Sequence, residues 1–158
     1  MKFEEPKGLN HVADFHHLFD APVLDTPAIP SRDRCELRVN LLQEELNELK
    51  EAIENNDMVG VADALGDLQY VLSGAIHEFG LGSKFSKIFD EIQRSNMSKT
   101  CDDMEIAELT SSHYVNEKGF ETKIVQKESV YLVYRIPDHK VLKSVKYSEA
   151  DLKKIIEE

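Results

Sequence analysis

Apolar residues recur every three or four positions through the first hundred residues, which is the period of amphipathic α-helices. This pattern predicts helices at about 10–18, 32–54, 58–79 and 83–97, with Ser31 as the N-cap of the second. Prolines at positions 22, 27 and 30 hold the segment between the first two helices extended. Gly80 and Gly82 end the third helix, because glycine favours the backbone conformation found there.

The pattern changes after Thr100. Residues 102–118 are polar and mixed, whereas 120–125 and 129–135 alternate apolar with polar positions, which is typical of a β-hairpin turning at 126–128. Ser148 and Asp151 resemble a capping box that opens a short last helix. We therefore predict a mainly α protein, with a four-helix body in 1–100 and an extension in 101–158 packed on the same domain.

The charge of the chain narrows the class of partner. With 30 acidic and 19 basic residues, the formal net charge is -11. Nucleic-acid binding relies on Lys and Arg that neutralise phosphates, so this balance argues against a nucleic-acid partner. It favours a divalent cation instead.

No stretch of the chain predicts a membrane anchor. The longest apolar-rich stretch, 59–81, contains Asp63, Asp67, His77 and Glu78, and the first ten residues lack the apolar core of a signal peptide. Cys35 and Cys101 lack the spacing of a metal or redox motif and are predicted to be reduced. A cytoplasmic location without a membrane partner is expected.

The stretch LLQEELNELKEAI concentrates carboxylates on one predicted helix. It contains Glu44, Glu45, Glu48 and Glu51, with only Lys50 as a counter-charge. At about 100° per residue, Glu45 and Glu48 lie beside the core-facing stripe, whereas Glu44 and Glu51 lie further towards water. A pair of carboxylates at such a boundary is costly without a partner, since partial burial and like charge both disfavour ionisation.

The next helix carries a matching pair. Asp63 and Asp67 share one face, with Tyr70 continuing the row, and the rest of this helix is so apolar that we expect it to be buried. Two antiparallel helices joined by a short turn would bring the two pairs together as an all-oxygen site suited to Mg²⁺ or Mn²⁺. Alternatives remain open: Glu44 as a solvated charge, Asp63 as a hydrogen-bonding group, and Tyr70 as a core residue rather than one that stacks on a base.

Taken together, these motifs resemble the all-α NTP pyrophosphohydrolases. EELNE at 44–48 and DALGDL at 63–68 carry the resemblance, and ADFHHLFDAPV, LRVNLLQEELNELKEAI and IFDEIQRSNMSK extend it over about 10–99. The similarity is greatest to phosphoribosyl-ATP-pyrophosphohydrolase-like, MazG-related members. It implies hydrolysis of a nucleoside triphosphate, or a related nucleotide, to the monophosphate and pyrophosphate.

The resemblance also implies roles for individual residues. Glu45, Glu48 and Asp67 would ligate the metal. Glu44 and Glu45 would be the catalytic residues, with Glu44 acting as a further ligand or as the base that activates water. Asn96 and Lys99 would contact phosphate; the alternative is that both simply end their helix, where a lysine complements the helix dipole. Homodimers or dimers of dimers are implied as the assembly.

One position departs from the family pattern. The usual E-x-x-D motif would place Glu at position 64, where the chain has Ala64, so Asp63 would have to substitute as a ligand. This departure keeps a second hypothesis open, in which the chain is a non-catalytic nucleotide-binding or helical oligomerisation module.

Overall fold

The computed structural model describes residues 2–158, which form two compact units, one ending at Phe85 and the other spanning Ser86–Glu158. The first unit contains α1 (Gly8–Leu18), α2 (Arg32–Glu54), α3 (Met58–Glu78) and the short 3-10 turn η1 (Gly82–Lys84). From Phe85 onwards follow α4 (Phe85–Met97), α5 (Met104–Lys118), β1 (Thr122–Lys127), β2 (Val130–Arg135) and α6 (Leu152–Glu157). The prediction of a mainly helical protein with a small hairpin and a short last helix is confirmed.

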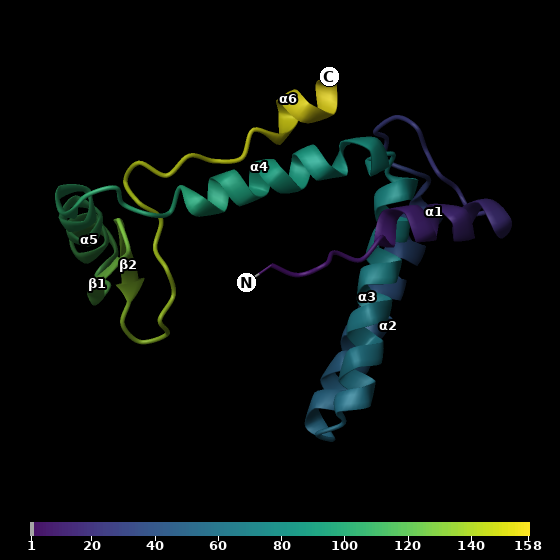
Figure 1. Ribbon diagram of the computed structural model, residues 1–158, viewed down its shortest axis with the longest axis horizontal. Helices are drawn as coiled ribbons and strands as arrows, with labels where there is room; N and C mark the ends of the chain where they lie inside the picture. The colour runs from purple at the N-terminus through teal and green to yellow at the C-terminus, as the bar shows by residue number, and fades with distance from the viewer. Residues whose placement is uncertain (1) are drawn as a thin grey trace. The chain divides into compact units, whose positions relative to one another are not determined.

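Helices α2 and α3 run antiparallel and side by side as the long pair in Figure 1. The side chain of Asp57 caps α3 by accepting hydrogen bonds from the backbone N–H groups of Val59, at 3.0 Å, and Gly60, at 3.1 Å. The small side chains of Ala52 and Ala64 are both buried, which lets the two helices approach closely. The short connection between α2 and α3, with Asp57 as the cap, fixes how the two helices are aligned. This alignment determines which carboxylates of α2 face those of α3.

A buried ionic network joins the first three helices. Glu78 on α3 accepts hydrogen bonds from Arg34 and Arg38 of α2. Arg38 also donates to His16 Nε2 at 3.1 Å, and His16 Nδ1 lies 2.8 Å from the carbonyl oxygen of Pro22. Because Arg38 can only donate and the carbonyl can only accept, His16 is neutral with its proton on Nδ1. Burial lowers its pKa further below 6.5.

Two glycines are required by close approaches in this region. A Cβ on Gly74 would lie 2.6 Å from Nη1 of Arg38 and 3.0 Å from Nε2 of His16. Gly80 has a φ of +67°, and a Cβ there would lie 1.9 Å from the carbonyl oxygen of Thr26. Gly74 therefore makes room for the ionic network, and Gly80 turns the chain out of α3 as the sequence predicts.

The expectation that α3 is buried all round is wrong for this structure. Its second half is buried from Ser73 to Glu78, but Leu65 is 52% exposed and Val59 is 80% exposed. Asp63 and Asp67 are also exposed. The reason is that α2 covers one face of α3, and α1 adds cover only over the second half. The fully buried carboxylate of α3 is Glu78.

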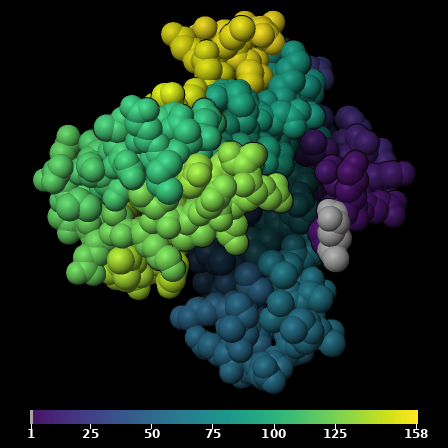
Figure 2. Space-filling view, turned by 60° about the vertical axis from the view of Figure 1, so that its left-hand side comes forward, coloured from purple at the N-terminus to yellow at the C-terminus, as the bar shows by residue number. Residues whose placement is uncertain are grey.

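Helix α5 occupies residues that the sequence predicts to be polar and mixed. Its buried stripe consists only of Ile106, Ala107 and Thr110, which is too narrow to give a clear periodic pattern. It packs against the hairpin around Val133, Leu142 and Cys101, which is a free thiol in this core. Figure 2 shows α5 and the hairpin gathered as one continuous body.

Two details of the extension differ from prediction. The hairpin pairs Lys127 with Val130, so its turn is only two residues long and begins at Glu128, which has a φ of 50°. Helix α6 is capped by Asp151, whose side chain accepts from the backbone N–H of Lys154 at 3.3 Å, and not by Ser148. Among the described residues, no helix combines the length and apolar character needed to span a membrane.

Candidate functional site

Glu45 is the one candidate residue whose carboxylate is partly enclosed between the two long helices. Its Oε2 atom is buried and has no hydrogen-bond partner within residues 2–158. Burial raises the pKa of Glu45, and Glu48, Asp67, Glu44 and Asp63 raise it further, in that order of effect. Asp63 and Asp67 therefore act on Glu45 from α3, whereas Glu44 and Glu48 act on it from its own helix.

The remaining carboxylates are open to solvent. Glu44, Glu48, Asp63 and Asp67 are all exposed. Glu48 and Asp63 line one hollow of about 330 Å³ near the α2–α3 turn, together with Glu51. Glu51, which the sequence assigns to a solvated face, thus borders the same hollow. The candidate site is therefore an open acidic surface with Glu45 at its buried edge.

The side chains of the candidate site are of the chemical type that binds a hard divalent cation. All of these side chains offer carboxylate oxygens, which Mg²⁺ and Mn²⁺ prefer, and the unpaired buried oxygen of Glu45 needs a compensating positive charge. Within residues 2–158, however, no three Asp, Glu, His or Cys side chains lie close enough together to hold an ion. The carboxylates would have to converge by side-chain rotation on binding.

Tyr70 lies on the surface and is 39% exposed. Phe15 of α1 packs edge-on against it, with ring centroids 5.7 Å apart, and Phe19 stacks obliquely on Phe15 at 4.3 Å. Of the two predicted roles, a fully packed core tyrosine does not describe this position. The sequence analysis did not single out Phe15 and Phe19, although their i,i+4 spacing in DFHHLF is a detectable signal.

Asn96 and Lys99 belong to the second unit, at the end of α4. Lys99 Nζ donates to Asn96 Oδ1 at 2.7 Å, and both side chains reach the surface. Between them, Ser98 Oγ accepts a hydrogen bond from the backbone N–H of Ser148 at 3.0 Å. The C-terminal segment therefore lies directly beside the predicted phosphate-contacting pair.

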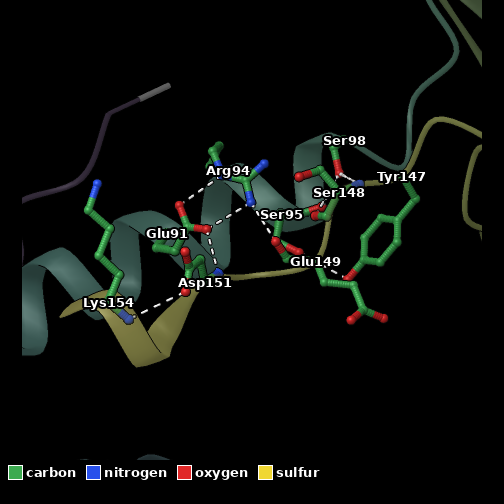
Figure 3. A network of polar contacts seen from close by, with 9 residues as sticks. All are labelled: Glu91, Arg94, Ser95, Ser98, Tyr147, Ser148, Glu149, Asp151 and Lys154. Carbon is green, nitrogen blue, oxygen red and sulfur yellow. Dashed lines mark hydrogen bonds and ion pairs between the residues drawn. The ribbon is translucent and has the colours of Figure 1, made fainter. Parts of the chain in front are cut away.

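Further polar contacts hold that segment along α4 (Figure 3). Arg94 donates to the carbonyl oxygen of Glu149 at 2.8 Å, and Glu91 accepts from the backbone N–H of Asp151 at 2.8 Å. Hydrogen bonds from Arg94 and then from Asp151 lower the pKa of Glu91 to about 2. The sequence gives little sign of this arrangement, because α4 contacts mainly the backbone of the segment.

The arginines of the buried network are likewise absent from the predicted site. Burial alone would raise the pKa of Glu78, but hydrogen bonds from Arg34 and Arg38 outweigh it and hold the pKa below 4.5. Arg34 and Arg38 stand at i,i+4 on α2, a signal that the sequence does offer. Because Arg34 and Arg38 form ion pairs with Glu78, they do not neutralise the carboxylates of the candidate site.

Comparison with known families identifies the class of protein to which this helical arrangement belongs. The family model described as phosphoribosyl-ATP pyrophosphohydrolase matches residues 12–96, which is more than half of the chain. The chain therefore belongs to this family, whose activity is the hydrolysis of pyrophosphate bonds in nucleotides.

A similar curated protein adds no further function. The chain is 27% identical over 139 residues to an uncharacterised protein of Acanthamoeba polyphaga mimivirus. The match covers 77% of this chain and 55% of that protein, so the chain spans about half the length of its relative.

Proposed function

We propose that the chain is a Mg²⁺-dependent nucleoside triphosphate pyrophosphohydrolase that releases a monophosphate and pyrophosphate. The observation that carries this proposal is the buried, unpaired oxygen of Glu45, set among four further carboxylates on two facing helices. In a chain from a pyrophosphohydrolase family, a divalent cation held by these carboxylates would supply the missing positive charge and would also bind polyphosphate. Mn²⁺ would suit the same ligands.

The carboxylates divide into two roles in this proposal. Glu45, Glu48, Asp63 and Asp67 would hold the cation. The bound cation would neutralise phosphate charge and lower the pKa of water. Glu44 is exposed beside this group and would accept a proton from the attacking water.

Positive side chains are needed at the phosphates, because the acidic surface repels a polyanion. Lys99 is a compact cation held by Asn96 at the end of α4, and we assign both to the substrate phosphates. Tyr70, three residues after Asp67, would contact the base. We further propose that the protein acts in the cytoplasm as a homodimer or a dimer of dimers.

The test is product analysis. The purified protein is incubated with the common ribo- and deoxynucleoside triphosphates in Mg²⁺, and the products are separated by ion-exchange chromatography. Equal amounts of monophosphate and pyrophosphate, abolished by EDTA, are expected for at least one nucleotide. A diphosphate with inorganic phosphate would contradict the proposed reaction. Binding with no product would favour the non-catalytic nucleotide-binding module.

A further inference from the structure

Three aromatic rings lie exposed together where α1 meets α3. Phe15 is 41% exposed, Phe19 is 62% exposed and Tyr70 is 39% exposed. Their contacts are direct, because Phe15 lies 4.3 Å from Phe19 and 5.7 Å from Tyr70 between ring centroids. We call these three residues the aromatic face.

The exposure of the aromatic face is unusual because large rings are the side chains that gain most from burial. Single apolar side chains on a surface are ordinary, but a contiguous group of them marks a binding site. The three rings are in mutual contact and still leave much of their area open to solvent. A flat, aromatic partner would cover this area.

The aromatic face adjoins the carboxylates of the candidate site. Tyr70 follows Asp67 by three residues and Asp63 by seven residues, so all three side chains leave α3 on one side. A ligand that stacks on Tyr70 and extends along α3 towards its N-terminus therefore reaches these carboxylates. Asp63, Asp67 and Tyr70 thus form one row along α3.

Helix α1, which carries Phe15 and Phe19, is held in position by polar contacts. His16, next to Phe15, is 2% exposed and is bound to Arg38 and to the carbonyl oxygen of Pro22. His77 Nε2 lies 2.7 Å from the carbonyl oxygen of Leu9, which ties the first turn of α1 to α3. The aromatic face is thus held in place before any ligand binds, which lowers the entropic cost of binding.

We infer that the aromatic face stacks against the base of the nucleotide whose phosphates extend towards the α2–α3 carboxylates. This inference rests on the proposed function and adds to it the surface that binds the base, including Phe15 and Phe19 of α1. Because every base has a π-face, stacking on aromatic rings tolerates different bases. The aromatic face thus selects nucleotides over inorganic polyphosphates, and Phe15 and Phe19 join Tyr70 as substrate-binding residues.

The test separates base binding from phosphate binding and does not require turnover. Calorimetry measures the affinity for the four α,β-methylene deoxynucleoside triphosphates and for inorganic tripolyphosphate, each with Mg²⁺. The variants are Phe15→Leu, Phe19→Leu and Tyr70→Leu. Phe89→Leu on α4 is the matched control, since Phe89 is also 62% exposed but lies outside the aromatic face.

Each of the three variants is expected to bind the nucleotides about 5- to 100-fold more weakly, which corresponds to the loss of one stacking contact. Affinity for tripolyphosphate should stay within about twofold, and it also reports whether the variant is folded. Phe19→Tyr, which keeps a ring, should restore nucleotide affinity. Phe89→Leu should match the wild type for both ligands.

Three results with the variants would overturn the inference. These are unchanged nucleotide affinity in all three variants, an equal loss for nucleotide and tripolyphosphate, and loss of self-association with nucleotide affinity intact, which would make the aromatic face a protein interface. Nucleotide binding by the wild type without hydrolysis would overturn the proposed reaction but not the stacking. Absence of nucleotide binding to the wild type would overturn both.

Discussion

At the scale of single residues, the carboxylates of α2 and α3 repel one another. Glu45 illustrates this, because burial and four nearby carboxylates disfavour its ionised form. The chain could remove this cost with an amide or an apolar side chain at position 45. A bound cation would compensate the negative charge of Glu45. Stability measurements can detect that compensation.

We predict that Glu45→Gln stabilises the protein at neutral pH in the absence of metal. The pKa of Glu45 is raised in the folded state, so between pH 4.5 and that raised pKa the folded chain binds more protons at this group than the unfolded chain does. Stability from this group is therefore present below pH 4.5 and is lost as pH rises through the folded pKa. Thermal unfolding followed by circular dichroism should show this decline in the wild type and its absence in the variant.

The same experiment with Mg²⁺ or Mn²⁺ supplies the complementary result. Either cation should raise the unfolding midpoint of the wild type and have little effect on Glu45→Gln. Glu54→Gln is the control, because Glu54 is an exposed residue of α2 paired only with Lys50 among the described ion pairs. An equal response of all three proteins to metal would show that the cation binds elsewhere.

At the scale of elements, the contacts between α1, α2 and α3 depend on small residues at crossing points. Gly74 leaves space for Arg38 and His16, whereas a methyl group added to Gly66 of the same helix would meet no atom within 4 Å. The two glycines therefore provide a direct comparison between a packing requirement and ordinary helix propensity.

We predict that Gly74→Ala lowers the free energy of unfolding by about 2 kcal/mol, since the new methyl group must displace the Arg38 guanidinium. Gly66→Ala should raise it by up to about 1 kcal/mol, because alanine is the better helix former and meets no obstacle. Urea titration measures both changes. Equal effects of the two substitutions would mean that the buried network does not constrain α3.

The helices of the first unit could be predicted from the sequence because strong periodicity and clear breakers coincide there. Ser31 and Gly80 mark helix ends that the structure places within a few residues of prediction. Helix α5 was not predicted, because it has no wide apolar stripe. Tertiary contacts with the hairpin stabilise it instead. The exposure of Asp63 could not be predicted, since a helix pattern does not specify how many neighbours cover the helix.

The candidate site was predictable to a similar degree. The family pattern predicts which carboxylates form the site, and this stays a prediction; the antiparallel pairing of α2 and α3, predicted from their short connection, is present in the structure. The burial of one Glu45 oxygen and the contact of Phe15 with Tyr70 depend on side-chain packing between distant segments. Sequence spacing within one helix carries no information about such contacts.

At the scale of the whole molecule, two rows of exposed apolar residues indicate self-association. The rows have seven-residue spacing and consist of Val39, Leu46 and Ile53 on α2, and Met58, Leu65 and Leu72 on α3. Each of these six side chains is at least 41% exposed. Rows of this kind on neighbouring helices are typical of helical bundles formed between chains.

We predict that the protein is a dimer or a larger assembly in solution and that Leu46→Glu with Leu65→Glu yields monomers. Light scattering should give a mass of at least twice 18.0 kDa for the wild type and 18.0 kDa for the double variant. Leu109→Glu is a suitable control, because Leu109 of α5 is 56% exposed outside these rows. A monomeric wild type would refute the assembly.

In our proposal, the carboxylates of α2 and α3 form a metal-dependent site for nucleotide hydrolysis. The most direct measurement is the initial rate of pyrophosphate release in Mg²⁺ by the wild type, Glu48→Gln and Glu54→Gln. We predict that Glu48→Gln lowers the rate by about 100-fold or more, since even supporting residues of metal sites cost 10- to 100-fold, whereas Glu54→Gln matches the wild type. Equal rates for all three proteins, or a rate that EDTA leaves unchanged, would contradict the claim.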